Sequence, residues 1–371
     1  MTHFAFTKSR LARIAFINAA ACVRQGAMKL GGNVLVTGAG GCIGSALAER
    51  IARSGAHRLI VLDHAEHELH EIDLTLSAIE GREPHVAVLG DICDASLLAD
   101  VFEKYCPVVV YHAAAFKHVA MMEVNPLAAI HNNVIGTMTL ARAARKYEAA
   151  QLVMCSTDKA VNPSSIMGVS KRIAELVLLR WNGIKTQMKS LRLGNVLGSR
   201  GSVAPLFREQ IARGGPVTVR HPDVSRYFLT LREVVDMILA TADLEGGVFV
   251  PESDEPVKIV ELARGMIRKA GYEPMEMPIA FTQLRPGEKL SEEMVFASES
   301  VEPSGDARIQ RVRGAAISAD EFDVKMARIV EGVEHRDLPA LVTALVSAVP
   351  EYEPSELLLR ALNPLARAAT K

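Results

Sequence analysis

The chain has 371 residues, enough for one large domain or two modest domains with a substantial core. Its charges nearly balance, with 42 Lys and Arg against 43 Asp and Glu, which excludes a field that would gather nucleic acid or an anionic membrane nonspecifically. The five cysteines form no CxxC pair and no histidines cluster at metal-ligand spacing, so we expect buried, reduced thiols in the cytoplasm and no metal site.

The first thirty residues carry basic but no acidic side chains around the apolar run ARIAFINAAACV. This run has twelve residues, whereas a membrane-spanning helix needs about 20. A targeting peptide, a membrane-surface helix, an ordinary N-terminal helix and an overlong start all remain open for this extension. Because the rest of the chain shows no transmembrane pattern, we expect a soluble protein without an integral membrane segment.

From Asn33 onward, short apolar runs alternate with helical patterns. The runs are almost continuously apolar, which is typical of strands covered by helices on both sheet faces. Regular alternation of strand and helix implies right-handed βαβ units and a Rossmann-type doubly wound parallel sheet, in the α/β class. The predicted strands are 33–37, 58–63, 85–89, 108–114, 151–157 and 189–193.

The amino-acid composition changes after about Asn195, where loops rich in Gly, Pro and Arg begin. Loops of this kind on a rigid α/β core commonly bind a ligand. A helical pattern returns from about Ser300. We therefore predict an N-terminal extension (1–30), a dinucleotide-binding domain (31–195), a smaller substrate-binding region partly interleaved with the sheet (196–300) and a C-terminal helical segment (301–371).

The stretch VTGAGGCIG follows the first predicted strand and opens the first helix. Its glycines allow a sharp turn and bring the backbone close to a pyrophosphate at the helix N-terminus. Asp63 ends the second strand, where its carboxylate can accept from the adenosine ribose and would repel a 2′-phosphate, so NAD is favoured over NADP. The alternative is an α/β fold that binds no nucleotide. The expected NAD-binding residues are Gly38, Gly40, Gly41, Cys42, Ile43, Gly44, Asp63, His64, Asp91, Ile92, Ala113, Ala114 and Lys171.

Thr157, Asp158 and Lys159 follow the fifth predicted strand, at the carboxyl edge where open α/β sheets bind ligands. Met167 and Lys171 lie one helical turn apart on a common helix face, and the Lys171 ammonium could hold the nicotinamide ribose. A thioether can neither give nor take a proton. These residues therefore indicate either a silent NAD-binding sensor or an enzyme with an unusual proton route.

The chain resembles the extended short-chain dehydrogenases/reductases, and within them the UDP-N-acetylglucosamine 4,6-dehydratases of bacterial glycan biosynthesis. The resemblance covers about residues 33–290, in the stretches TGAGGCIGS, HAAAFKHV, STDKAVNP, MGVSKR, GNVLGSRGSV, GGPVTVRHPDVSRYF and RPGEKL, and the ending VPEYEPS is also similar. Longer family members carry an N-terminal membrane region, which we expect this chain to lack. A homo-oligomer is the family expectation.

The resemblance implies that hydride passes from C4 of the sugar to NAD, water is eliminated across C5 and C6, and hydride returns to C6. In this scheme Asp158 is the acid for the C6 oxygen, and Lys159, with a lowered pKa, is the base for C5. Met167 replaces the usual Tyr, so a water held by Thr157 takes the C4 hydroxyl proton. Met at this position resembles the branch that retains the configuration at C5, giving UDP-2-acetamido-2,6-dideoxy-α-D-xylo-hexos-4-ulose.

The loops after the sixth strand supply the expected contacts with the UDP-sugar. Arginine and lysine side chains suit the diphosphate, Glu288 suits the uridine ribose, and Lys117 and His118 suit the sugar pocket. A C5-inverting dehydratase, a UDP-sugar 4-epimerase and the sensor remain alternatives, and the hexosamine is open. The expected substrate-binding residues are Lys117, His118, Asn195, Arg200, Ser202, Arg226, Arg285, Glu288 and Lys289.

Overall fold

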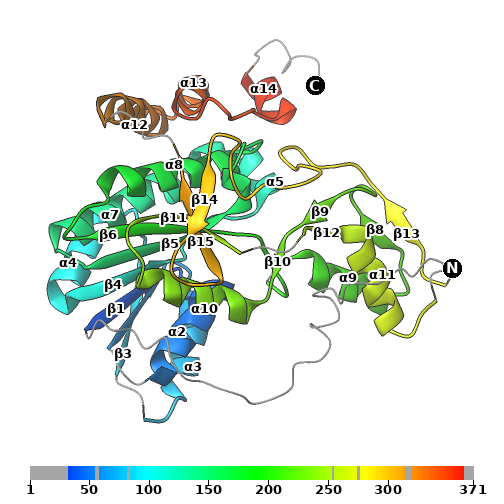
Figure 1. Ribbon diagram of the computed structural model, residues 1–371, viewed down its shortest axis with the longest axis horizontal. Coiled ribbons are helices and arrows are strands. Elements are labelled where there is room, and N and C mark those ends of the chain that lie inside the picture. The colour runs from blue at the N-terminus through cyan, green and yellow to red at the C-terminus, as the bar shows by residue number, and fades with distance from the viewer. Residues whose placement is uncertain are drawn as a thin grey trace.

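The computed structural model describes residues 32–54, 58–81, 84–199, 201–252, 255–273, 276–314 and 319–362. The predicted extension (1–30) and Arg200 lie outside these ranges. In the described part of the chain, nine strands form one sheet in the order β14-β15-β11-β6-β5-β4-β1-β2-β3 (Figure 1). Strand order reverses between β1 and β4, which confirms the predicted doubly wound Rossmann-type sheet.

Every strand predicted from an apolar run is present and parallel to its neighbours. Most of these runs are buried because helices cover both faces of the sheet, and β2 is buried along its whole length, whereas the edge strand β3 is only partly buried. These strands are β1 (Asn33–Thr37), β2 (Leu59–Asp63), β3 (His85–Leu89), β4 (Pro107–His112), β5 (Gln151–Thr157) and β6 (Gln187–Leu193).

Successive residues of a central strand such as β1 pack into hydrophobic cores on opposite faces of the sheet. Val34 and Val36 pack with α2 (Cys42–Ser54), α3 (Glu66–Ser77) and α10 (Leu231–Ala242) on one face of the sheet. Leu35 packs on the other face with α4 (Ala95–Tyr105), α7 (Gly136–Lys146) and α8 (Ile166–Trp181). A period of two along the strand thus places apolar side chains in both helix layers.

Helix α8 is buried on both sides, because a further helix layer covers it (Figure 1). That layer consists of α12 (Ala319–Glu334), α13 (Leu338–Ala348) and α14 (Glu356–Leu362). The short α5 (Val119–Glu123), α6 (Pro126–Ile130) and a π-helical turn (His131–Ile135) pack at the same end of the molecule.

The stretch VPEYEPS ties this outer layer to the start of α8. The Glu123 carboxylate accepts from the Ile166 backbone N–H at 2.6 Å and from the Ser355 hydroxyl. The Ser165 hydroxyl accepts from the Gly168 N–H at 3.1 Å and caps the same helix. The C-terminal segment therefore helps to fix the helix that carries Met167 and Lys171.

The prediction that residues 301–371 are helical is wrong for their first part. Strands β14 (Ser300–Pro303) and β15 (Ile309–Arg313) form an antiparallel hairpin, and β15 pairs with β11 (Gly247–Pro251). Val301 lies opposite Val312 in this hairpin. The strands are short and half exposed, so they lack the continuous apolar runs that identified the central strands.

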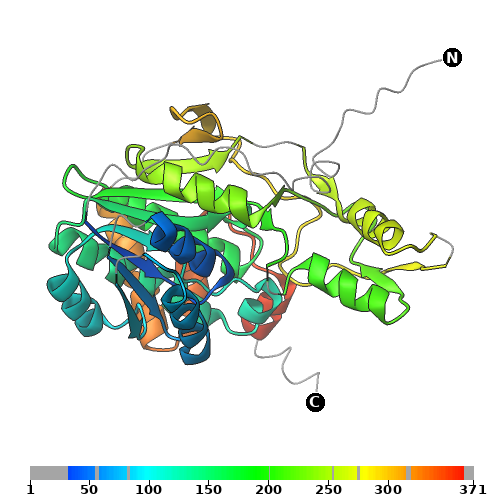
Figure 2. The same cartoon turned by 90° about the horizontal axis from the view of Figure 1, so that it is seen from below.

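A smaller lobe projects beside the carboxyl edge of the sheet, as Figure 2 shows from below. Its own core contains Phe207, Val217, Val219 and Ile267. The lobe and its connections consist of β7 (Asn195–Val196), α9 (Val203–Ala212), β8 (Val217–Val219), β9 (Ser225–Arg226), β10 (Phe228–Leu229), β12 (Val257–Lys258), α11 (Ile259–Lys269) and β13 (Ile279–Phe281). Among the helices of the described ranges, none is both long and apolar enough to cross a membrane.

Lys189 is a fully buried lysine in β6. Its amine donates to the Gln151 side chain and to the Ala242 carbonyl at the end of α10. Burial lowers the pKa of Lys189 from 10.5 to about 7, although Asp243 opposes the shift. The folded amine is therefore harder to protonate than the unfolded one.

We expect this lysine to make stability depend on pH. Between pH about 7 and 10.5 the unfolded state binds the extra proton, so the free energy of unfolding should rise with pH by at most ~1.4 kcal/mol per unit. Lys189→Met should remove this slope. Urea unfolding of both proteins at several pH values between 7 and 9.5 measures it, and parallel pH profiles would contradict the assignment.

Candidate active site

The glycine loop between β1 and α2 is packed too closely for side chains at Gly38, Gly40 and Gly44. Gly38 has a positive φ of 69°, and a Cβ there would lie 2.4 Å from the Ala114 backbone nitrogen. A Cβ on Gly44 would lie 2.0 Å from the Gly38 carbonyl oxygen. At Gly41 the nearest atom to a Cβ is 3.2 Å away, and this residue lines the cavity described below. The loop therefore presents backbone to the cavity at the N-terminus of α2.

Asp63 ties this loop to the end of β2. Its carboxylate accepts from the Gly40 N–H at 2.9 Å and from the Ala65 N–H at 3.0 Å. A carboxylate oxygen can accept more than one hydrogen bond, so these contacts leave room for ribose hydroxyls. Asp91 lies just after β3 and accepts from the Cys93 N–H at 2.8 Å, and Ile92 is buried in the core. His64 packs edge-on against Phe116 with ring centroids 6.0 Å apart.

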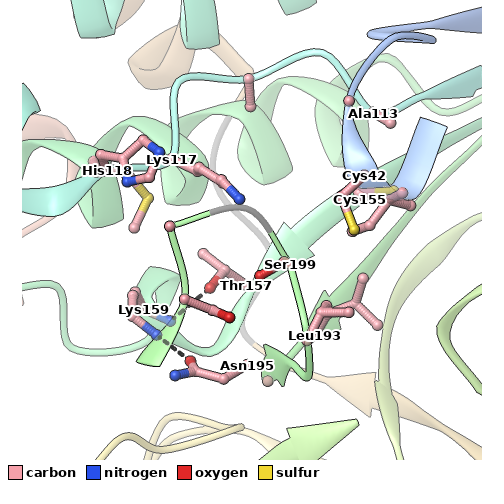
Figure 3. Close-up of a pocket in the computed structure, with 18 of the residues that line it drawn as sticks. Cys42, Ala113, Lys117, His118, Cys155, Thr157, Lys159, Leu193, Asn195 and Ser199 are labelled. Carbon is pink, nitrogen blue, oxygen red and sulfur yellow. Dashed lines mark hydrogen bonds between the residues drawn. The ribbon is translucent and has the colours of Figure 1, made fainter. Parts of the chain in front are cut away.

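A cavity of about 740 Å³ joins the glycine loop to the smaller lobe. Figure 3 shows Lys117 and His118 on one wall, with Thr157, Lys159 and Asn195 on another. The predicted residues that line it are Gly41, Cys42, Ile43, Gly44, Ala113, Lys117, His118, Thr157, Lys159, Met167, Lys171, Asn195 and Ser202.

Lys159 is anchored in the cavity wall by three acceptors. Its ammonium donates to Asp158 Oδ1 at 2.9 Å and to Asn195 Oδ1 at 3.1 Å, and Glu292 Oε1 lies 3.7 Å away. Burial lowers the pKa of Lys159, but Asp158 and Glu292 outweigh that effect and raise it above its ordinary value. The prediction of a lowered pKa is thus wrong for this structure, because it did not take the second carboxylate, Glu292, into account.

Asp158 lies behind Lys159 rather than in the cavity. Its side chain is fully buried and is absent from the cavity lining of the described residues. The Thr157 hydroxyl donates to Asp158 Oδ1 at 2.9 Å, whereas Oδ2 is buried without a hydrogen-bond partner. Any proton that Asp158 exchanges with a ligand must therefore pass through a neighbouring group or a local rearrangement.

Met167 and Lys171 lie on the first two turns of α8, on the side that faces the cavity. Both are buried, with exposed fractions of 4% each. Burial lowers the pKa of Lys171 to about 8, against the opposing influence of Cys155 and Glu175. The predicted arrangement of a lysine one turn after a methionine is present, and the thioether occupies the wall.

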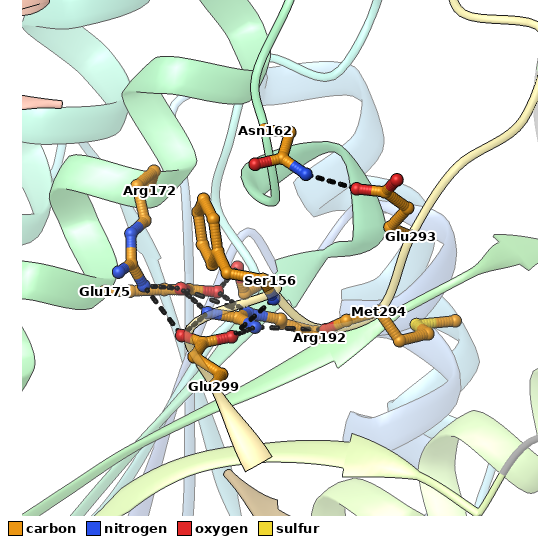
Figure 4. Close-up of polar contacts among 9 residues, drawn as sticks. Ser156, Asn162, Arg172, Glu175, Arg192, Glu293, Met294 and Glu299 are labelled. Carbon is orange, nitrogen blue, oxygen red and sulfur yellow. Dashed lines mark hydrogen bonds and ion pairs between the residues drawn. The ribbon is translucent and has the colours of Figure 1, made fainter. Parts of the chain in front are cut away.

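A buried ion-pair network supports this wall from beneath (Figure 4). Arg192 of β6 donates to both oxygens of Glu175 on α8, at 3.0 to 3.2 Å, and pairs with Glu299. Glu175 also accepts from the Ser156 hydroxyl at 2.6 Å, and Ser156 lines the cavity. The network joins a sheet strand, the cavity wall and α8.

Only part of the predicted substrate set reaches the cavity. The sequence predicts that the Arg226 guanidinium binds a diphosphate. That prediction is wrong for this structure, because the guanidinium is buried and donates to the carbonyls of Ser225, Lys289 and Leu290. Lys289 donates to the Val161 carbonyl at 2.9 Å.

The remaining members of the predicted set lie in the loop after β13. Arg285 is exposed, and its backbone N–H donates to the Glu288 carboxylate at 2.9 Å. Neither side chain is among those that line the cavity in the described ranges. Their binding roles stay predictions.

The sequence did not single out several cavity residues, which include apolar side chains of the loops after β4 and β6. Phe116, Ser156 and Leu197 lie within family stretches named above, but apolar side chains and a lone serine carry no chemical signal that assigns them to a site. They include Phe116, Met121, Met122, Cys155, Ser156, Leu193, Leu197 and Phe228.

The crowding at Gly44 makes a testable contrast with Gly41. We expect Gly44→Ala to lower stability by roughly 1–3 kcal/mol, since its methyl group would overlap the Gly38 carbonyl. Gly41→Ala should lower stability less but weaken NAD binding, because its methyl group points into the cavity. Thermal unfolding and NAD titration of both variants measure this, and a Gly44→Ala protein with wild-type melting temperature would contradict the close packing.

Comparison with known proteins identifies related sequences. Residues 34–313 match the family model described as polysaccharide biosynthesis protein. The chain is 46% identical over 271 residues to the capsular polysaccharide biosynthesis protein CapD of Staphylococcus aureus, covering 72% of this chain and 45% of that protein. It is 44% identical over 275 residues to the probable polysaccharide biosynthesis protein EpsC of Bacillus subtilis, covering 72% and 46%. The chain thus spans about half the length of these relatives.

The fold is shared with a solved dTDP-glucose 4,6-dehydratase, the DesIV double mutant from Streptomyces venezuelae, whose structure has NAD and DAU bound. The TM-score is 0.62 at 22% identity, covering 71% of this chain and 88% of that chain. The family match covers most of the cavity-lining segments described above, and the chain belongs to the polysaccharide biosynthesis protein family.

Proposed function

We propose that the protein is an NAD-dependent UDP-N-acetylglucosamine 4,6-dehydratase that retains the configuration at C5 and serves bacterial glycan biosynthesis. The main support is the hydrogen-bonded pair of Lys159 and Asp158 at a cavity that also contains the glycine loop and Lys171. An acid–base pair at this place suits the elimination of water. A simple oxidation does not require such a pair.

The residues at the glycine loop fit NAD. Backbone at Gly41 and Cys42 borders the cavity at a helix N-terminus whose first turn contains no acidic residue, which favours a pyrophosphate. Asp63 is placed for the adenosine ribose, and Lys171 for the nicotinamide ribose. NAD, when bound, accepts a hydride from C4 of the sugar and returns it to C6.

Thr157 offers a route for the C4 hydroxyl proton in place of the missing tyrosine. Its hydroxyl hydrogen is given to Asp158, and its oxygen accepts from the Lys159 backbone N–H at 3.4 Å, so one lone pair is left to accept from a water in the cavity. We assign to that water the C4 hydroxyl proton, which then passes outward to solvent. Met167 takes no part in the transfer and only shapes the wall.

We assign one shared proton to the Lys159–Asp158 pair, and before substrate reacts it rests on Lys159, because Asp158 and Glu292 raise the pKa of that amine. Before elimination this proton passes to Asp158 along the 2.9 Å hydrogen bond. The neutral amine then takes the C5 proton, which the 4-ketone has made acidic. Asp158 supplies the proton for the departing C6 oxygen by relay through the Thr157 hydroxyl, which contacts Asp158 and lines the cavity. When hydride has returned to C6, Lys159 gives a proton back to C5 from the same face, so the configuration at C5 is retained. The pair then regains one proton from solvent, which balances the C4 hydroxyl proton released earlier.

Turnover of UDP-N-acetylglucosamine in the presence of NAD tests this proposal. Proton NMR in D₂O should show a C6 methyl signal in the product, ring couplings of the retained C5 configuration and no accumulation of NADH. A C4-epimerised sugar without a methyl signal would indicate an epimerase. NAD binding without any turnover would indicate a sensor.

A further inference from the structure

Glu292 is a buried carboxylate that faces the proposed catalytic lysine. It is 5% exposed, and its Oε1 lies 3.7 Å from both Lys159 Nζ and Arg226 Nε. Its other oxygen, Oε2, is buried without a hydrogen-bond partner. A buried carboxylate with an unsatisfied oxygen is unfavourable, so its place beside two cations calls for an explanation.

Arg226 connects Glu292 to the loop that carries Arg285, Glu288 and Lys289. The guanidinium donates to the Lys289 carbonyl at 2.8 Å and to the Leu290 carbonyl at 3.1 Å. It therefore fixes the backbone immediately before Glu292. Through this arrangement the loop expected to bind the nucleotide reaches the amine of Lys159.

Three acceptors surround the Lys159 ammonium, from three separate segments. Asp158 follows β5, Asn195 begins β7 and Glu292 comes from the loop after β13. An ammonium has three hydrogens to direct at such a set. We propose that Glu292 is a positioning residue, which with Asp158 and Asn195 holds the charged Lys159 amine at the cavity wall until substrate arrives.

This inference rests on the proposed function for its catalytic meaning. The electrostatic coupling of Glu292 to Lys159 does not depend on any substrate. Asp158 and Glu292 raise the pKa of Lys159, and Arg226 lowers it. Lys171 on α8 and Lys117 line the same cavity and are the other cations to consider, and the titratable His118 lines it as well.

Removing the Glu292 charge should make the Lys159 ammonium easier to deprotonate. In Glu292→Gln we expect the titration midpoint of Lys159 to fall by about one pH unit, because an anion about 4 Å from an ammonium favours its charged form. Glu292→Asp keeps the charge but retracts it, so its midpoint should lie between those of Glu292→Gln and wild type. Glu293→Gln is the matched control, because Glu293 is the exposed neighbour that accepts from Asn162.

Competitive acetylation of the full-length protein with acetic anhydride between pH 7 and 11, followed by peptide mass spectrometry, reports the midpoint of Lys159 without substrate. Equal midpoints in wild type, Glu292→Asp and Glu292→Gln would overturn the inference. If Glu292→Gln does not fold, the difference between Glu292→Asp and wild type still decides.

The same variants should show a matching change in catalysis. Only the singly protonated Lys159–Asp158 pair is active in the proposed mechanism, so kcat falls when the pair loses its proton at high pH. This alkaline limb should move to lower pH in Glu292→Gln by the same amount, with KM for UDP-N-acetylglucosamine unchanged within about twofold. An unshifted limb with a shifted labelling midpoint would overturn the catalytic part. A wild-type enzyme that does not dehydrate this sugar would overturn the proposed function and leave the coupling in place.

Discussion

Replacing Lys159 with methionine is expected to reduce the proposed dehydration by a factor of about 10²–10⁴ while leaving NAD binding intact. Lys159 lines the cavity, whereas Asp158 is buried behind it, so the amine is the member of the pair placed to touch the sugar. Methionine keeps a similar length and removes only the proton-carrying group.

Asp158→Asn should give a comparable loss, since it removes the group that accepts the proton of Lys159. Lys185→Met is a suitable control, because Lys185 is an exposed lysine that pairs with Glu148 at the surface. Product formation by NMR, NAD affinity by calorimetry and the melting temperature separate catalysis from folding. Full activity in both active-site variants would show that the assigned roles are wrong.

Arg192→Leu is expected to destabilise the protein by about 3–5 kcal/mol. Arg192 and Glu175 are fully buried, and Glu299 is nearly so, with its side chain 7% exposed (Figure 4). Loss of the guanidinium leaves both carboxylates with Arg172 as the remaining arginine of the network, at 3.1 Å from Glu175 and 3.6 Å from Glu299. Removing one partner from a buried network leaves charge without compensation.

The acid response of this network follows from Glu175. Burial raises its pKa, but Arg192 and Arg172 outweigh that effect and hold it below its ordinary value. Its contribution to stability is therefore present above the ordinary carboxyl range and is lost as pH falls through the lowered pKa. Arg192→Leu should weaken this acid-dependent loss.

Arg180→Leu provides a matched control on α8, the helix that carries Glu175. Arg180 pairs with Asp323 at 3.3 Å, and both side chains are substantially exposed, so the change should amount to no more than ~1 kcal/mol. Equilibrium unfolding in urea compares the two variants. An Arg192→Leu protein within about 1 kcal/mol of wild type would contradict the view that the network holds the cavity wall in place.

The central sheet was predictable from the sequence because its strands are buried on both faces. Continuous apolar runs such as LIVLD in β2 have few alternatives in a chain that alternates strand and helix. The hairpin of β14 and β15 escaped prediction because its residues are half exposed and carry several charges. Pairing with β11 stabilises it, and a partner 50 or more residues away in the chain leaves no local pattern.

The same distinction applies to the site. The glycine loop and the positions of Thr157, Lys159, Met167 and Lys171 follow from local motifs, and the structure brings them to one cavity. The raised pKa of Lys159 did not follow, because it depends on Asp158 together with Glu292, and Glu292 lies far away along the chain. Likewise, nothing in the local sequence reveals that the Arg226 guanidinium donates hydrogen bonds to backbone carbonyls of another loop.

The fate of the C4 hydrogen tests the proposed reaction most directly. UDP-N-acetylglucosamine labelled with deuterium at C4 would be converted with NAD, and the product examined by deuterium and proton NMR. The proposed mechanism predicts that the deuterium appears in the C6 methyl group, because the hydride removed from C4 returns to C6 of the same sugar. Deuterium that remains at C4, or that accumulates in released reduced cofactor, would contradict it.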